Sequence, residues 1–320
     1  MTGIKSNAVA LEMALKPAFA STAPVSIGVQ SVLFNNELTH VGKSIESLFR
    51  SVELGVTSGV LNSVSLHLGD SSPIPCISSA DLQRLRDKYR GAIEIRYDFF
   101  GGNLGSAGGH NRLAAQNMAD FLLIQNPDVI VSPRLLETVV QTFRTPGVGM
   151  VEGKQLPIEH PKEYDRITGE TCWATTACAM IPGELFRQLG GFDADCFFLY
   201  CDDVDFSWMV REAGYNVIFQ PAAVVFHDKR LSPQGKWQPS NAEEYYSAEA
   251  ALFMTYKWSR RDLTESFLKY FEGSNNPQHK KAAATFKKRR DSSALPQPRD
   301  PGHRIGQFID GMYTKHRFPL

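Results

Sequence analysis

The sequence predicts an α/β protein built on a mostly parallel, Rossmann-like central sheet, and two observations support this fold class. Apolar runs typical of buried strands alternate with helical patterns over the first hundred residues, as in parallel sheets with helices on their faces. Polar residues follow several of these runs directly, at the strand ends where parallel sheets hold their ligands. We therefore expect a binding site along one edge of the sheet.

Composition limits the class of protein. The chain has 320 residues, 42% of them hydrophobic, which is enough for one large core. Lys+Arg 34 balances Asp+Glu 34, which argues against nucleic acid as a specific partner. Five cysteines without paired or zinc-like spacing fit a reducing compartment, and no run of 18 apolar residues predicts a membrane span. We expect a cytoplasmic protein whose residues 1–24 form an N-terminal arm, because Glu12 and Lys16 interrupt the apolar region that a signal peptide needs.

The expected elements follow one another along the chain. Short β-branched runs predict strands at 25–33, 64–68, 93–97, 121–124, 149–151 and 178–181. Apolar residues at helical spacing predict helices at about 41–53 and 79–90, one starting near 109, one after Ser132-Pro133, and one that leads to residue 189. The last helix leads into residues 190–228, the stretch around which the rest of the chain is organised.

Two segments before that stretch have ligand-binding chemistry. The glycines at 101, 102, 105, 108 and 109 allow close backbone approach, and a helix after them would offer N–H groups to an anion. Their spacing is not that of dinucleotide-binding or P-loop proteins. The strand at 121–124 then stops at Gln-Asn-Pro-Asp, where Asp128 is placed to hold a divalent cation against phosphate oxygens. The alternative is an ordinary Asn-Pro-Asp turn.

The stretch 190–228 concentrates acidic residues. Asp202, Asp203 and Asp205 follow an aromatic run, and a short helical pattern comes next. Crowded, poorly hydrated carboxylates repel one another, so at least one should be tuned, paired or metal-bound. The alternative is that they only favour the N-terminus of the helix. Beyond the helix, two apolar runs separated by Pro221 end at His227.

Together these motifs resemble a known family. NLGSAGGHN, QNPD, GGFD, FFLYCDDVDF and AGYNVIFQPAAVVFH occur in the order found in the inverting family-2 glycosyltransferases, closest to the bacterial rhamnosyltransferase-like branch that builds surface polysaccharides. The likeness covers residues 25–228. It implies an A-type nucleotide-sugar transferase fold, with a nucleotide-binding half and a mixed-sheet half for the acceptor. It also implies sugar transfer from dTDP-rhamnose or a UDP-sugar to a glycan or polyprenyl-linked acceptor, with Mg²⁺ or Mn²⁺.

The resemblance implies a role for each matching residue. Asp128 matches the acid of the metal motif, and His227 matches a histidine that completes the metal site. Asp203 matches the catalytic base, beside Asp202 where glutamate is usual. The residues expected to contact the nucleotide-sugar are Asn35, Asp70, Asn103, Gly105, Asn111 and Asn126. Gly-Asp-Ser-Ser at 69–72 departs from the family's Asp-Asn-x-Ser pattern, which leaves the base and sugar of the donor open.

Two other functions are compatible with the same fold class. One is a catalytically silent subunit that binds glycan or assists assembly, against which the retained Asp128, Asp203 and His227 argue. The other is a sugar nucleotidyltransferase, which would carry a glycine-rich basic segment after the first strand. SVLFNNELTH has neither glycine nor Lys/Arg.

The C-terminal quarter of the chain is expected to lie outside the catalytic domain at 25–236. Ser240 and Glu243 form a capping box that opens a long helix within an extension at 237–272. Its aromatic and basic residues suit either peripheral contact with anionic lipid at the inner face of a membrane, or packing on the catalytic domain with a solvated basic edge. Composition predicts a basic, flexible tail at 273–320.

Overall fold

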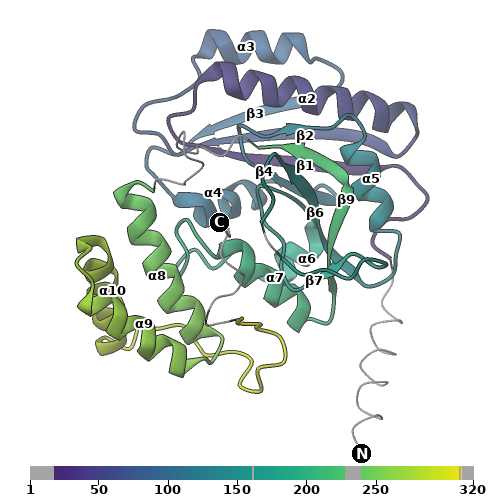
Figure 1. Ribbon diagram of the computed structural model, residues 1–320. Helices are drawn as coiled ribbons and strands as arrows, with labels where there is room; N and C mark the ends of the chain where they lie inside the picture. The colour runs from purple at the N-terminus through teal and green to yellow at the C-terminus, as the bar shows by residue number, and fades with distance from the viewer. Residues whose placement is uncertain (1–17, 161, 228–238, 310, 312–320) are drawn as a thin grey trace, which may run out of the picture.

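The computed structural model describes residues 18–160, 162–227, 239–309 and 311 (Figure 1). A nine-stranded sheet crosses the described chain in the order β3-β2-β1-β4-β8-β6-β9-β5, and β7 pairs with β9. The strands are β1 Val25–Leu33, β2 Leu61–Asp70, β3 Glu94–Phe99, β4 Phe121–Gln125, β5 Ile130–Val131, β6 Val148–Leu156, β7 Glu170–Thr171, β8 Cys178–Pro182 and β9 Asn216–Phe226.

The sheet has two halves of different construction. Strands β3, β2, β1 and β4 pair in parallel, whereas β8 is antiparallel to both β4 and β6. Farther along, β9 is parallel to β6 and antiparallel to β5 and β7. The expected combination of a parallel half with a mixed half is confirmed.

Helices cover both faces of the sheet. They are α2 Leu38–Thr57, α3 Ser79–Lys88, α4 Gly105–Ala114, α5 Leu135–Thr142, α6 Gly183–Gln188, α7 Asp202–Glu212, α8 Asn241–Lys257, α9 Arg261–Gly273 and α10 Pro277–Asp291. One apolar core lies between the sheet and α2 with α5, and another lies under α4, α6 and α7 (Figure 1). A third core joins α7 to α8, α9 and α10.

Two elements differ from the sequence-based expectation. The helix expected near Gly109 begins at Gly105, so three glycines of the loop, at 105, 108 and 109, lie within α4. A Cβ at Gly109 would collide with Val32 of β1, which shows that glycine allows this helix to pack closely on the sheet. The two apolar runs around Pro221 form one strand, β9, whose register shifts between Gly153 and Lys154 of β6. This irregularity accommodates a proline that cannot donate a ladder hydrogen bond.

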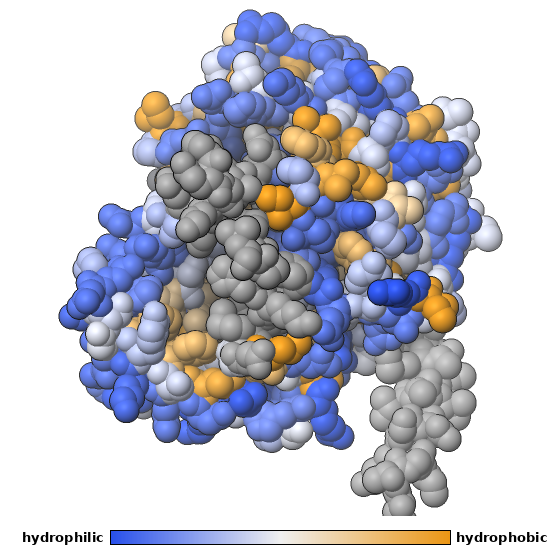
Figure 2. All heavy atoms as spheres, viewed as in Figure 1, coloured by the Kyte–Doolittle hydropathy of each residue, from blue (hydrophilic) through white to orange (hydrophobic). Residues whose placement is uncertain are grey.

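The expectation of a flexible tail from residue 273 is wrong for the part that the structure describes. Asn276 caps a new helix, α10, through its side chain, and Pro277 occupies the first turn. Ala282, Ala283 and Phe286 are buried against α8 and α9, so an apolar stripe outweighs the basic composition that suggested disorder. The outer surface of this region is mostly hydrophilic (lower left of Figure 2).

The segment after Ser240 also differs in detail. The predicted capping box of Ser240 and Glu243 is confirmed. The chain leaves helical geometry at Ser259, whose φ is +61°, so α8 and α9 are two helices instead of one. Phe253 and Trp258 are fully buried, Phe253 against Phe286 of α10 and Trp258 against Trp208 of α7, so part of this aromatic face packs on the catalytic domain. Within the described residues, no helix has the length and apolar character that crossing a membrane requires. Residues 1–17 of the expected N-terminal arm lie outside the described part.

Candidate active site

Asp128 and His227 come together at the edge of the sheet. Asp128 lies in the turn between β4 and β5, and His227 directly follows β9, which pairs with β5. The Oδ1 atom of Asp128 lies 3.8 Å from Nε2 of His227. Asn126 completes the group, because its Nδ2 atom lies 3.5 Å from the same Nε2. The structure therefore brings together three residues that are predicted to bind metal or nucleotide-sugar.

The hydrogen bonds of His227 favour a metal-binding tautomer. Its Nδ1 atom lies 3.0 Å from Oε1 of Gln155, and an amide oxygen can only accept, so Nδ1 carries the proton. The lone pair of Nε2 then faces Asp128. Metal-binding histidines commonly donate their other ring N–H to such a carbonyl.

A divalent cation fits this arrangement. Carboxylate oxygen and imidazole nitrogen are both ligands of Mn²⁺, and two ligands 3.8 Å apart can bind one ion. The described residues contain no cluster of three or more His, Cys, Asp or Glu side chains around a common point. The remaining ligands would come from substrate phosphate and water, as at many Mg²⁺ sites.

Asp202 opens helix α7 in a buried environment. It follows Cys201, whose left-handed φ of +62° turns the chain sharply into the helix. Only 4% of Asp202 is exposed, and its Oδ2 atom accepts a hydrogen bond of 2.8 Å from the Ser106 hydroxyl. Burial, and next the charge of Asp203, raise the pKa of Asp202 to about 8. At neutral pH this carboxyl group is therefore mainly protonated.

Asp203 and Asp205 have different surroundings. Asp203 is half-buried, and its carboxylate accepts a hydrogen bond from the amide of Val204. Asp205 is fully buried and bonds to Lys257 and Trp258 of the C-terminal extension. The alternative that the acids only favour the start of the helix does not account for these contacts of Asp205. Asp203 is the one acid of the three with appreciable exposure.

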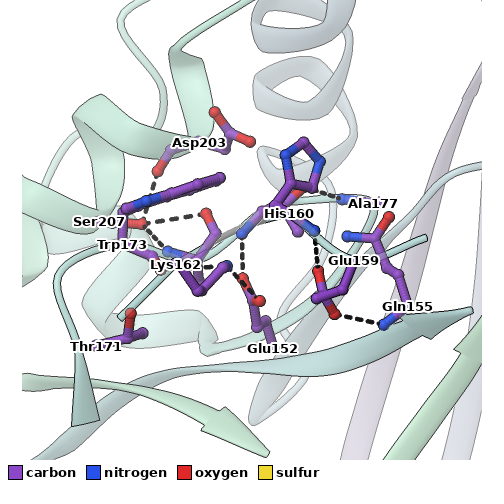
Figure 3. Close-up of polar contacts among 12 residues, drawn as sticks. Glu152, Gln155, Glu159, His160, Lys162, Thr171, Trp173, Ala177, Asp203 and Ser207 are labelled. Carbon is purple, nitrogen blue, oxygen red and sulfur yellow. Dashed lines mark hydrogen bonds and ion pairs between the residues drawn. The ribbon is translucent and has the colours of Figure 1, made fainter. Parts of the chain in front are cut away.

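Trp173 lies on a buried ion pair beside α7. Glu152 of β6 pairs with Lys162, whose ammonium group lies 4.0 Å from the centre of the Trp173 ring. The Glu152 carboxylate also accepts from the amide of Thr175. Figure 3 shows Trp173 between Lys162 and the helix that carries Asp203, with the His160 ring edge-on to it at 5.5 Å. Trp173 is 2% exposed and is therefore part of the core.

The glycine-rich loop mainly shapes the protein around the acids. Gly105 has a φ of +69°, and a Cβ there would overlap the carbonyl oxygen of Phe198. That carbonyl accepts a hydrogen bond of 2.8 Å from the Ser106 amide. The Oδ1 atom of Asn103 accepts from the amide of Gly105 and so holds the start of α4. The loop is thereby fitted against the segment that leads to Asp202.

Asn111 has a structural role in place of the expected nucleotide contact. Its Nδ2 atom donates to the carbonyl of Phe192 at 2.7 Å, and its Oδ1 atom accepts from the amide of Phe192 at 2.9 Å. Both ends of the amide are therefore engaged by the loop that contains Gly191. This pairing ties helix α4 to the chain between α6 and α7.

Asp70 organises the loop that follows β2. It is fully buried and accepts hydrogen bonds from the amides of Ser72 and Cys76 and from the hydroxyl of Tyr97. Burial alone would raise the pKa of Asp70, but these hydrogen bonds outweigh it and lower the pKa. Both oxygens of Asp70 are therefore engaged in holding this loop. Asn35 is exposed at the end of β1, has a φ of +54° and donates its amide to Ser72.

Backbone contacts join the acidic helix to the Asp128 turn. The amide of Asn126 donates to the carbonyl of Ala177, and the amide of Ala174 donates to the hydroxyl of Ser207 on α7. The short segment 174–177 thus runs from the candidate metal pair to the helix of Asp203. Sequence motifs did not identify four of the residues that build the site, namely Ser106, Glu152, Gln155 and Lys162. Alternation along β6 would only have shown that Glu152 is buried in a strand.

Similarity in sequence to known proteins is limited. The chain matches no family model. The uncharacterized protein y4gI of Sinorhizobium fredii (strain NBRC 101917 / NGR234) is 23% identical over 185 residues, 49% of this chain and 20% of that protein. The N-acetylglucosaminyl-diphospho-decaprenol L-rhamnosyltransferase of Mycobacterium tuberculosis (strain CDC 1551 / Oshkosh) is 35% identical over 60 residues, 19% of each chain. The matched parts thus span about a fifth of the length of these relatives.

Similarity in structure is more extensive. The crystal structure of GalNAc-T7 with UDP, GalNAc and Mn²⁺ superposes with a TM-score of 0.60 at 12% identity, covering 84% of this chain and 55% of that one. Mannosyltransferase PcManGT from Pyrobaculum calidifontis, in complex with GDP-Man and Mn²⁺, has a TM-score of 0.53 at 15% identity and covers 91% and 83%. The chain therefore has the A-type glycosyltransferase fold that its motifs predict.

Proposed function

We propose that this chain is an inverting glycosyltransferase that moves a sugar from a nucleoside-diphosphate donor to a hydroxyl acceptor with the help of a divalent cation. One observation carries the proposal. On an A-type glycosyltransferase fold, the Asp128–His227 pair and the acids of α7 lie at the two ends of segment 174–177. Both solved neighbours contain Mn²⁺ with a nucleotide or nucleotide-sugar, which supports this assignment.

Each side of the site would have a distinct task. Asp128 and His227 would hold the cation, which when bound supplies positive charge against the diphosphate leaving group. Asn35, Asn103 and Asn126 would contact the nucleotide-sugar. Gly105 would contribute by bringing α4 close to the donor.

The acids of α7 would act on the acceptor. Asp203, half-exposed at the start of the helix, would take the proton of the attacking hydroxyl. Asp202, held mainly neutral and bound to Ser106, would orient its neighbour. Neighbouring carboxyls whose pKa values are pushed apart by their environments commonly divide acid and base roles in this way. With one base on the acceptor side, the proposed mechanism is a single displacement with inversion at the anomeric carbon.

The substrates belong to the same proposal. The family resemblance and the 60-residue likeness to an N-acetylglucosaminyl-diphospho-decaprenol L-rhamnosyltransferase favour dTDP-rhamnose as donor and a polyprenyl-linked glycan as acceptor. A UDP-sugar donor with a free glycan acceptor is the next candidate, because one solved neighbour contains UDP and GalNAc. Surface polysaccharide synthesis at the inner face of the membrane would be the corresponding process.

A panel of nucleotide-sugars tests the proposal. The purified chain is incubated with each donor and Mn²⁺, with and without EDTA, and released nucleoside diphosphate and pyrophosphate are measured separately. We expect diphosphate release that EDTA abolishes. Pyrophosphate release from a sugar phosphate and a nucleoside triphosphate would indicate a nucleotidyltransferase. Glycan binding without turnover of any donor would indicate a silent subunit.

A further inference from the structure

A buried cation from the C-terminal extension reaches the helix of the candidate base. Lys257 is the last residue of α8, and its side chain is 6% exposed. Its Nζ atom lies 2.7 Å from Oδ2 of Asp193 and 2.8 Å from Oδ2 of Asp205. The indole of the next residue, Trp258, donates to Oδ1 of Asp205 at 2.9 Å. The start of α7, the loop before it and the end of α8 meet at this point.

The geometry favours a charged Lys257–Asp205 pair, because one oxygen of Asp205 accepts from the ammonium group and the other from an indole. Burial raises the pKa of Asp205, and Lys257 and Trp258 oppose that rise. Burial would lower the pKa of Lys257, but Asp205 and Asp193 outweigh it and raise the pKa. Asp205 lies two residues after Asp203. The charge of Asp205 is therefore balanced by Lys257, a residue outside the motifs of the catalytic domain.

The part of the chain that follows the catalytic domain also packs around the rest of helix α7. Trp208 packs edge-on against Trp258, with ring centres 5.2 Å apart, and against Phe308 at 5.1 Å. The guanidinium group of Arg211 donates to the carbonyl of Ile305 at 2.6 Å. The helix of the candidate base and the C-terminal helices therefore share one apolar core.

The loop that leads into α7 is held from the same side. The ring of Tyr246 on α8 stacks on Phe198 at 4.5 Å with an interplanar angle of 19°. The hydroxyl of Tyr200 donates to Glu243 at 3.2 Å. Phe198 is also the residue whose carbonyl accepts the Ser106 amide, and the Ser106 hydroxyl bonds to Asp202. Contacts from α8 thus continue to the first acid of the site.

We infer that the C-terminal helices are part of the catalytic centre and that Lys257 is a positioning residue for Asp202 and Asp203. This inference rests on the proposed glycosyltransferase function. Lys257 neutralises Asp205 and joins it to Asp193, which fixes the loop and the first turn of α7 in one orientation. Without that cation, a buried carboxylate would be left unpaired within the turn that carries both acids.

The test compares two lysines of the C-terminal helices in the full-length protein. Lys257→Met removes the buried cation, and Lys287→Met removes an exposed one that pairs with Glu272 on the same helical bundle. We expect Lys257→Met to lower kcat about 10²-fold, as small misplacements of catalytic groups do, with the donor KM nearly unchanged. Lys287→Met should leave both constants at the parent values. Parent-like kcat in a folded Lys257→Met protein would overturn the inference.

A double variant covers the case in which Lys257→Met fails to fold. Asp205→Asn combined with Lys257→Met removes both charges and so avoids the unpaired carboxylate. A folded double variant with low kcat and a normal donor KM supports positioning. A double variant with parent kcat would show that the pair only balances charge, which contradicts the inference.

Hydrogen exchange tests the inference without any variant or substrate. In the parent protein at increasing urea concentration, the amides of 202–212 and 248–258 should become exchangeable together, because they belong to one core. Opening of α8 while α7 stays protected would contradict the inference. Joint opening combined with no turnover of any donor would leave this structural unit intact and reject only the proposed function.

Discussion

Asp202 and Asp203 are adjacent in the chain but differ in their surroundings. Asp202 is buried beside Ser106, whereas Asp203 is half-exposed. The family resemblance assigns Asp203 as the base, whereas the residue pattern alone does not rank the two acids, because burial depends on where helix α4 and the loop before α7 lie. The greater exposure of Asp203 agrees with that assignment.

The raised pKa of Asp202 predicts a specific pH dependence of stability. The folded protein keeps a proton that the unfolded chain loses above about pH 4. The contribution of Asp202 to the free energy of unfolding should therefore fall as pH rises from about 4 to about 8, and should level off above the folded pKa. Glu152, His67 and His110 also have shifted pKa values, so urea unfolding at several pH values measures this contribution as the difference between the parent and Asp202→Asn. The exposed Asp87→Asn should retain it. Identical pH profiles for the parent and Asp202→Asn would disprove the assignment.

Gln155 is predicted to raise the metal affinity of His227 through its hydrogen bond with Nδ1. Gln155→Leu removes the acceptor that holds the Nδ1 proton, and loss of such a partner typically costs about 10- to 100-fold in metal affinity. Titration with Mn²⁺ followed by electron paramagnetic resonance, in the presence of UDP, measures the affinity directly. Gln188→Leu, on the exposed face of α6, is the matched control. Equal Mn²⁺ affinity in the Gln155 variant and the parent would exclude this role.

At the scale of elements, the glycine-rich loop shows what a motif does and does not predict. The sequence predicted close approach of this backbone, and the structure confirms close approach to the protein itself. Gly105 meets the carbonyl of Phe198, which is 93 positions away in the chain. Such a partner follows from tertiary packing of α4, which no local pattern specifies.

Two glycine variants in this loop are expected to differ strongly. Gly105→Ala places a side chain at a φ of +69° against the Phe198 carbonyl, and a left-handed non-glycine residue alone costs about 1–2 kcal/mol. Gly102→Ala adds its Cβ to open space. Chemical denaturation should show the loss of stability only for Gly105→Ala, and kcat should fall with it. Equal stability of both variants would show that the loop does not need glycine at 105.

At the scale of the whole molecule, the sequence predicted the sheet but not its relation to the C-terminal helices. The succession of strands and helices in the parallel half follows from alternating patterns, and family motifs pointed to Asp128, His227 and the α7 acids. The strand order β3-β2-β1-β4-β8-β6-β9-β5 comes from the structure. Lys257 and Asp205 are 52 residues apart, and a buried lysine has no sequence signature. The basic composition after residue 273 pointed to disorder because charged residues outnumber the few apolar ones that the bundle buries.

The core of the C-terminal bundle provides a stability test. Phe286→Ala should lower the free energy of unfolding by about 3–5 kcal/mol, because the Phe286 ring of α10 is 2% exposed and packs against Phe253 of α8. Lys288→Ala, on the exposed side of the same helix, should leave the free energy of unfolding nearly unchanged. Deletion of residues 273–320 should impair folding of the catalytic domain instead of sparing its chemistry. A deletion variant with full stability and turnover would contradict the shared core.

The most direct measurement of the whole account is the transfer rate of Asp203→Asn. This change keeps the shape of the side chain but removes its ability to accept a proton, and base catalysis typically contributes about 10²- to 10⁴-fold. The account predicts a rate lowered by that factor with donor affinity nearly intact, and a smaller loss for Asp202→Asn. Near-normal transfer by Asp203→Asn, together with an inactive Asp202→Asn, would contradict the assignment of the base.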